Sequence, residues 1–385
     1  MNMCFRLAAA AAGLLLGTAV SFGAVFAEDW SVPLEFGEAN AKGMVLMEGE
    51  TGRVLFGVNP DEKLPMASTT KIMTALLALE QPNPDTSFVV NAAAIQVEGT
   101  SMGLREGDSA TLRTLAAGML LASGNDAANA AAAAIDGNLR DFAARMNRRA
   151  ADIGMANTSF VTPSGLDDEN HYSTARDMGL LAREALRNPD FAELCASSTQ
   201  KLYYGNPPYA RWLTNHNRLL REYDGAVGVK TGFTKKSGRC LVSAATREDV
   251  TLICVTLGAS DDWNLHKRAL DAGFSALRRY SLSQLAEGKY RVPVTGGVRN
   301  SVRVVPQEDV YLSLTEEEAE RAEIEVRYST LEYAPVARGD VLGGVSVLLD
   351  GQLLRDVLLV AQEDCASKPA ENKGVFSRLF GSAGK

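Results

Sequence analysis

The segment between Pro65 and Pro82 constrains the fold more than any other part of this 385-residue chain. Proline favours the first position of a helix, and Pro82 prevents a helix from continuing. Between them, apolar side chains fall on every side of a helical cylinder: Met66, Ile72, Met73, Leu76, Leu77 and Leu79. A helix that is apolar all round must be covered on all sides. The sequence therefore predicts a buried central helix over about 65–80.

Strand-like segments flank a helical middle. Gly43–Glu48 and Arg53–Val58 are joined by a Gly-rich turn, which is typical of a hairpin. Strand character returns at Gly225–Thr234, Arg239–Ala245 and Val250–Leu257. Helical spacing covers Leu112–Ala122, Ala127–Ile135, Phe142–Ile153, Ala175–Arg187 and Asn264–Arg279. This order predicts an α+β domain over 28–282, in which one antiparallel sheet is closed by N- and C-terminal segments and packed with helices.

After about residue 282 the pattern becomes that of a small all-β domain, which we expect to cover 283–365. Its β-type segments are Tyr290–Val305, Val310–Leu314, Glu323–Val326 and Val341–Val360. The last segment, 366–385, is polar with one apolar cluster, Val375, Phe376, Leu379 and Phe380. That spacing suits either a short helix lying on a membrane surface or a frayed tail.

Residues 1–27 have the pattern of an export signal. Arg6 precedes the apolar run Leu7–Phe26, and Ala27 ends a Val-Phe-Ala sequence typical of a signal-peptidase site. The alternative is a retained membrane anchor, because about 20 apolar residues can span a bilayer. We expect cleavage after Ala27 and a mature protein that works outside the cytoplasm.

Composition excludes several classes of protein. The net charge of −8 argues against a nucleic-acid partner, since phosphate binding needs a concentrated basic face. Five cysteines and three histidines are too few and too scattered for a disulfide scaffold or a zinc cluster. Cys240 and Cys254 lie in neighbouring predicted strands, where they either pair across a hairpin or stay free and buried.

Ser68 and Lys71 form an S-x-x-K motif in the first turns of the central helix. A spacing of three residues places the hydroxyl and the amine on one helix face. A serine hydroxyl becomes a good nucleophile when a neighbour takes its proton, and a neutral lysine can do so. Burial and a second cation both lower the pKa of a lysine, which suits a base that works near neutral pH.

Two further motifs follow, Ser123-Gly124-Asn125 at a helix junction and Lys230-Thr231-Gly232 within a strand. Together with S-x-x-K they are the signature of serine β-lactamases and penicillin-binding proteins. The chain resembles the serine-type D-alanyl-D-alanine carboxypeptidases, the low-molecular-mass penicillin-binding proteins of the S11-type peptidases. Stretches that carry the resemblance include Leu64–Glu80, Gly99–Asp108, Leu120–Ala128, Met146–Asp167, His171–Asp177, Asn215–Leu220 and Gly228–Leu241.

The resemblance implies a β-lactamase/transpeptidase-like catalytic domain with a small C-terminal all-β domain. It implies that Ser68 attacks the carbonyl between two terminal D-alanines and that Lys71 is the general base. Ser123 would relay a proton to the leaving amine, and Asn125 would hold the substrate amide and Lys71.

The strand motif supplies the remaining substrate-binding groups. Lys230 would provide positive potential, and Thr231 would bind the terminal carboxylate. Gly232 leaves the strand bare, so that a peptide can lie against its edge and pair by main-chain hydrogen bonds. The backbone N–H groups of Ser68 and Phe233 would form the oxyanion hole.

The implied reaction needs no metal or cofactor. Its substrate is a peptidoglycan stem peptide ending in D-Ala-D-Ala, and β-lactam antibiotics would acylate the same serine. Alternatives are an endopeptidase or transpeptidase acting on cross-linked stems, a β-lactamase, and a non-catalytic wall-binding protein. The segment Gly258–Trp263 lacks the arginine that many family members carry there, and the next arginine is Arg268.

Three other patterns are set aside. Gly99–Gly103 matches the G-x-S-x-G nucleophile elbow but lacks a strand before it and a helix after it. Glu184 and Asn188 have the spacing by which some β-lactamases hold a water, yet a solvated helix face explains them as well. The histidines, His171, His216 and His266, lack metal-ligand spacing, so we expect structural or surface roles.

Overall fold

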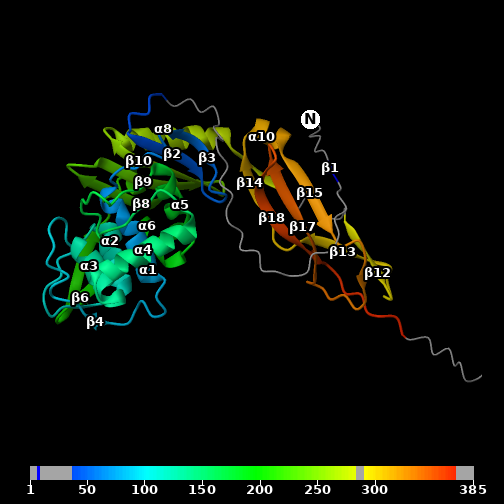
Figure 1. Ribbon diagram of the computed structural model, residues 1–385, viewed down its shortest axis with the longest axis horizontal. Coiled ribbons are helices and arrows are strands. Elements are labelled where there is room, and N and C mark those ends of the chain that lie inside the picture. The colour runs from blue at the N-terminus through cyan, green and yellow to red at the C-terminus, as the bar shows by residue number, and fades with distance from the viewer. Residues whose placement is uncertain (1–6, 9–36, 283–289, 370–385) are drawn as a thin grey trace, which may run out of the picture. The chain divides into compact units, whose positions relative to one another are not determined.

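The computed structural model describes residues 7–8, 37–282 and 290–369, which form two compact units (Figure 1). The larger unit holds the described residues from 37 to 278, and the smaller unit holds the rest. Most of the predicted export signal and the apolar cluster of the C-terminal tail lie outside the described residues. None of the helices in the described part of the chain combines the length and apolar character needed to cross a bilayer.

The larger unit is built on an antiparallel sheet in the order β3-β2-β10-β9-β8. The N-terminal hairpin β2–β3 and the C-terminal strands β8, β9 and β10 share this sheet, which confirms the predicted closure. The strands are β2 (Gly43–Glu48), β3 (Val54–Val58), β8 (Ala226–Thr234), β9 (Gly238–Arg247) and β10 (Val250–Ala259).

Both faces of this sheet are covered, as the alternation of its apolar side chains requires. On β2, Met44 and Leu46 pack in a cluster with Leu265 and Leu270 of α8 (Asp262–Ala276). Val45, the residue between them, packs in the opposite cluster with the helices of residues 71–196. Figure 1 shows α8 along one face and the helices of residues 71–196 on the opposite side.

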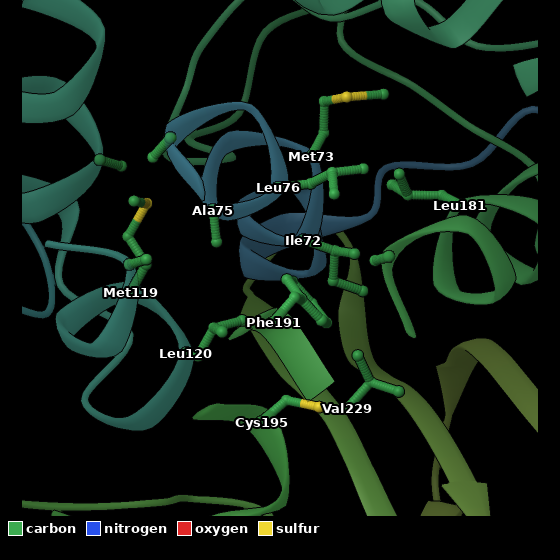
Figure 2. Packing of buried hydrophobic residues seen from close by; sticks show 14 of the residues in the cluster. Ile72, Met73, Ala75, Leu76, Met119, Leu120, Leu181, Phe191, Cys195 and Val229 are labelled. Carbon is green, nitrogen blue, oxygen red and sulfur yellow. The ribbon is translucent and has the colours of Figure 1, made fainter. Parts of the chain in front are cut away.

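The predicted central helix is α1 (Lys71–Leu79), and each of its residues is buried. Around it lie α2 (Leu112–Leu121), α3 (Asn125–Asp136), α4 (Leu139–Ile153), α5 (Ala175–Leu186) and α6 (Pro189–Ala196). In Figure 2, Ile72 and Leu76 of α1 face side chains such as Leu120, Leu181, Phe191 and Val229 from four other elements. Apolar side chains from neighbouring elements therefore cover α1 on all sides, as its sequence predicted.

The helix begins later than predicted. The 3₁₀ turn η1 (Ala67–Thr70) precedes α1, and Leu64 forms an isolated bridge with Ser173 instead of entering a helix. Ala67 has φ of +49°, a left-handed conformation that cannot continue a right-handed helix. Pro65 therefore lies in the extended approach to the turn.

Several elements of the larger unit had no predicted counterpart. Helix α6 follows the Asn188-Pro189 start signal, in which the Asn188 side chain accepts from the N–H of Phe191. The hairpin β6 (Thr199–Gly205) and β7 (Pro208–Thr214) belongs to a small sheet with β4 (Phe88–Val89) and β5 (Ser109–Ala110). A short helix, α7 (Leu219–Glu222), leads into β8.

The smaller unit has its own apolar core and is mainly β, as predicted. One sheet has the order β1-β15-β17-β18-β13-β12-β16, and β11 pairs with β14. The one helix found there in the described residues, α10, begins with a capping box at Thr315 and Glu318. Its elements are β1 (Leu7–Ala8), β11 (Arg278–Ser281), β12 (Arg291–Thr295), β13 (Ser301–Pro306), β14 (Tyr311–Leu314), α10 (Glu316–Arg321), β15 (Glu323–Tyr328), β16 (Glu332–Tyr333), β17 (Val341–Leu349) and β18 (Gln352–Ala361).

The four cysteines in the described residues are free and buried, so the question left open for Cys240 and Cys254 is resolved. Cys240 belongs to the core cluster on the α1 face of the sheet, and Cys254 belongs to the cluster on the α8 face. Their side chains point to opposite faces, which prevents a disulfide.

Candidate active site

Ser68 lies on the 3₁₀ turn that leads into the buried helix. The backbone of this turn packs directly against Gly165, since a Cβ at that glycine would lie 2.0 Å from the carbonyl oxygen of Ala67. The left-handed conformation of Ala67 is rare for a residue with a side chain. Such strain concentrates at functional sites, and here it orients the residue directly before the predicted nucleophile.

The Lys71 amine has three partners, and they define its hydrogen-bonding state. Nζ lies 2.7 Å from Oδ1 of Asn125, 2.6 Å from the carbonyl oxygen of Ser164 and 2.8 Å from Oγ of Ser68. The Asn125 amide is oriented by its Nδ2, which donates to the carbonyl oxygen of Glu98 at 2.7 Å. Two of the three partners of Lys71 can therefore only accept a hydrogen bond.

A neutral amine has two N–H donors and one lone pair. If both donors go to the acceptors Asn125 and Ser164, the lone pair faces the hydroxyl of Ser68, which can donate. Burial lowers the pKa of Lys71 well below its ordinary value, and the charge of Lys230 lowers it further. The site thus favours the neutral form that a general base needs.

Lys230 lies on β8 and is also buried. Burial lowers its pKa to about 7, and its Nζ donates to the carbonyl oxygen of Thr231 at 2.8 Å. Gly232 brings this strand against the nucleophile turn, because a Cβ there would lie 3.1 Å from the backbone nitrogens of Ser68 and Thr69. A larger residue would push β8 away from Ser68.

Ser123 and Asn125 come from the junction between α2 and α3, as predicted. Ser123 has φ of +59°, and its carbonyl oxygen accepts from the Thr100 hydroxyl at 2.6 Å. Asn125 is the first residue of α3 and is buried. The junction therefore places one residue in the pocket and a second on the Lys71 amine.

One pocket of about 340 Å³ collects most of the predicted site residues. Among its lining residues are Ser68, Ser123, Thr231, Gly232 and Phe233. Lys71, Asn125 and Lys230 lie behind this surface and are each at most 4% exposed. All eight residues named from the sequence are thus brought to one region of the larger unit.

The pocket also contains residues that the sequence analysis did not assign to it: Thr100, His216, Arg239, Cys240, Asp262 and Trp263. Thr100 belongs to the segment that was set aside as a false nucleophile elbow. His216 was expected to be structural or on the surface, but it lines the pocket, and burial together with Lys230 lowers its pKa. Spacing along the chain carried no signal for these positions.

The other two histidines have the structural roles expected of them. The His171 ring accepts from the N–H of Val161 and bonds the Thr70 hydroxyl, which braces the nucleophile turn. His266 lies between two hydroxyl groups on β9 and β10. Glu184, set aside as a water holder, instead forms an ion pair with Arg149.

Two family models match this chain. The Peptidase S11 family model, described as D-alanyl-D-alanine carboxypeptidase, matches residues 29–261. The model of the penicillin-binding protein 5 C-terminal domain matches residues 283–367. Both units of the chain therefore have a counterpart in known families.

Individual relatives match over most of both chains. The D-alanyl-D-alanine carboxypeptidase DacF of Bacillus subtilis is 32% identical over 84% of this chain and 85% of its own length. DacA of Haemophilus influenzae is 30% identical over 94% and 93%, respectively. The crystal structure of penicillin binding protein 5 from Haemophilus influenzae has a TM-score of 0.68 at 27% identity, covering 86% of this chain and 99% of that one. The chain belongs to the S11 family of serine D-alanyl-D-alanine carboxypeptidases.

Proposed function

We propose that Ser68 is the nucleophile and Lys71 the general base of a D-alanyl-D-alanine carboxypeptidase reaction. The observation that carries the proposal is the set of three contacts on the Lys71 amine. Two of the partners only accept, so the lone pair of the neutral amine is left for the Ser68 hydroxyl. Few structural roles for a buried lysine need this arrangement.

In the acylation step, Ser68 Oγ forms a bond to the carbonyl carbon between the two D-alanines as its proton passes to Lys71 Nζ. The backbone N–H groups of Ser68 and Phe233 stabilise the negative oxygen of the tetrahedral intermediate. The C–N bond then breaks, and Ser123 relays the proton from Lys71 Nζ to the leaving amine of D-alanine, which leaves Lys71 neutral again. Water hydrolyses the ester and returns Ser68 to its starting state.

The other site residues bind the substrate. Asn125 holds Lys71 and the substrate amide, and the strand edge at Gly232 pairs with the peptide backbone. Thr231 binds the terminal carboxylate, and Lys230 contributes positive potential whenever it is protonated. The substrate is a peptidoglycan stem peptide ending in D-Ala-D-Ala, and β-lactam antibiotics acylate Ser68 as mimics of that terminus.

The cellular site is part of the same proposal. Residues 1–27 direct export, residues 28–282 and 283–365 form the catalytic and β-rich domains, and residues 366–385 contact the outer face of the cytoplasmic membrane peripherally. Support comes from the export-signal pattern of residues 1–27 and the apolar cluster of the tail. Cell fractionation of the full-length chain beside one ending at residue 365 tests both ideas.

The experiment that tests the reaction is mass spectrometry of a pentapeptide stem incubated with the protein and, separately, with its Ser68→Ala variant. Loss of one D-alanine in the unmutated sample alone supports both the reaction and the nucleophile. Equal loss in both samples contradicts the assignment of Ser68. No loss in either sample refutes the carboxypeptidase reaction, and cleavage of a cross-linked dimer would then indicate an endopeptidase.

A further inference from the structure

The end of the pocket beyond Thr231 contains an arginine that the sequence motifs do not include. Arg239 is near the start of β9 and lines the pocket together with Thr231 and Phe233. In the sheet, it lies opposite Phe233 on β8 and opposite Ala259 on β10. It therefore bridges the strand that carries Thr231 and the segment after β10 that lacks an arginine.

The guanidinium of Arg239 is held from one side. Its Nε and Nη2 lie 3.0 Å and 2.8 Å from the same oxygen, Oδ1 of Asp262, whose side chain is 4% exposed. The ring of Trp263 lies 5.7 Å from the guanidinium carbon. These contacts fix the plane of the group while leaving its side chain 44% exposed.

The contacts of Arg239 leave donors for a ligand. A guanidinium carries five N–H donors in a planar fork, which matches the two oxygens of a carboxylate. Neither bond to Asp262 uses Nη1, and no hydrogen bond of Nη1 is found within the described part of the chain. The Nη1 edge is thus available to an anion in the pocket.

Arg239 is also the pocket residue that stays positively charged at neutral pH. The buried amines of Lys71 and Lys230 both have lowered pKa values, and the amine of Lys230 is bonded to a backbone carbonyl. An arginine keeps its charge at any pH at which the protein is folded. At neutral pH, a carboxylate in the pocket is therefore bound by the positive charge of Arg239 more than by either lysine.

We propose that Arg239, together with the Thr231 hydroxyl, binds the C-terminal carboxylate of the substrate, and that Asp262 is the residue that positions it. The inference rests on the proposed carboxypeptidase function. Recognition of the substrate carboxylate is thereby assigned to an arginine on β9, because the segment that follows β10 has no arginine.

The test compares a D-Ala-D-Ala peptide with the same peptide carrying a C-terminal amide. In Arg239→Gln, kcat/KM for the acid should fall about 10- to 100-fold, as expected when a hydrogen bond to a charged group is lost. The value for the amide should change less than about threefold, because the amide carries no charge for Arg239 to bind. Arg239→Lys should recover part of the loss on the acid.

Two further variants separate charge recognition from other effects. Arg218→Gln is the matched control, since Arg218 also stacks on Trp263, at 5.8 Å, but pairs with Glu222 and does not line the pocket. It should leave both substrates unaffected. Arg239→Gln leaves the carboxylate of Asp262 without its partner, and the double variant Arg239→Gln with Asp262→Asn removes that charge. In the double variant, kcat/KM should still fall for the acid and not for the amide.

The outcomes are distinct. Equal losses on acid and amide, or no loss on the acid, overturn the role of Arg239. A double variant that regains full activity on the acid also overturns it, because the single variant would then act only through repulsion by Asp262. If the unmutated protein releases no D-alanine from the acid, the proposed function fails, and this inference fails with it.

Discussion

Asp126 should contribute more to the stability of the larger unit than an ordinary surface carboxylate. It is the second residue of α3 and is 2% exposed. Its Oδ1 accepts from the N–H of Met102 at 2.9 Å, and its Oδ2 accepts from the N–H of Leu104 at 2.9 Å. Oδ2 also accepts from the Ser101 hydroxyl and the N–H of Gly103. One carboxylate thus holds the loop that carries the pocket residue Thr100.

The cost of Asp126→Asn follows from these contacts. The new amide would face the buried N–H of Leu104, and leaving one buried donor unsatisfied costs about 1–3 kcal/mol. The bond from Met102 would change from charged to neutral and lose roughly 1 kcal/mol. The Ser101 hydroxyl can reverse its bond, and the N–H of Gly103 keeps its contact with Ser101 Oγ at 2.8 Å. We expect the free energy of unfolding to fall by about 2–4 kcal/mol.

Urea unfolding followed by tryptophan fluorescence measures this change. Trp212 and Trp263, the tryptophans in the described residues, both belong to the larger unit, so their fluorescence reports on its unfolding. The matched control is Asp136→Asn at the other end of α3, where a partly exposed ion pair with Arg145 should contribute about 1 kcal/mol or less. If Asp126→Asn destabilises the protein no more than Asp136→Asn, the carboxylate does not hold the loop and the reasoning is wrong.

Three further predictions concern backbone strain and buried charge. Gly165→Ala should lower the free energy of unfolding by more than about 2 kcal/mol in the urea assay and slow acylation by penicillin, because its Cβ would collide with Ala67. The control is Gly107→Ala, at a similar φ of +80° but with open space around it, which should lower the free energy of unfolding by about 1 kcal/mol. Burial lowers the pKa of His266 to about 3, so the unfolded chain binds the extra proton between pH 6.5 and 3. Stability should therefore fall with decreasing pH across that window, by up to about 1.4 kcal/mol per unit, and less steeply in His266→Gln. The pKa of Lys230 is about 7 in the folded protein and 10.5 ordinarily, so the unfolded chain binds more protons than the folded protein between these pH values. The free energy of unfolding should therefore rise with pH in this range. Lys230→Met should make that rise less steep, leaving the part contributed by Lys71, whose pKa is also lowered, and should increase stability at pH 7. Its acylation by penicillin should become at least tenfold slower. Urea unfolding at pH 7 and pH 9 and stopped-flow acylation check these outcomes.

Those parts of the fold that depend on local pattern could be predicted from the sequence. The contact between Ser68 and Lys71 follows from a spacing of three residues, and the buried helix follows from apolar residues on all its sides. The antiparallel sheet followed from strand-like segments at both ends of a helical middle. The gathering of Ser123, Asn125 and Lys230 around Ser68 could be expected only from the resemblance to a family, because those contacts span the whole unit.

Other parts of the site left no pattern to find. The carbonyl oxygens of Ser164 and Glu98 hold Lys71 and Asn125, but a backbone group says nothing through its own residue type. Arg239 begins a predicted strand next to a polar turn, at a position where a charged residue is ordinarily solvated. The hairpin β6–β7 was missed because it is largely exposed, so its residues alternate weakly between core and solvent.

Locating the penicillin adduct tests whether Ser68 is the nucleophile and Lys71 its base. Brief exposure to benzylpenicillin followed by proteolysis and peptide mass spectrometry identifies the acylated residue. We expect one adduct, on the peptide that contains Ser68. It should be absent in Ser68→Ala and should form at least 100-fold more slowly in Lys71→Met, since general base catalysis contributes about 10²–10⁴-fold. An adduct on another serine, or undiminished acylation of Ser68→Ala, would contradict this expectation.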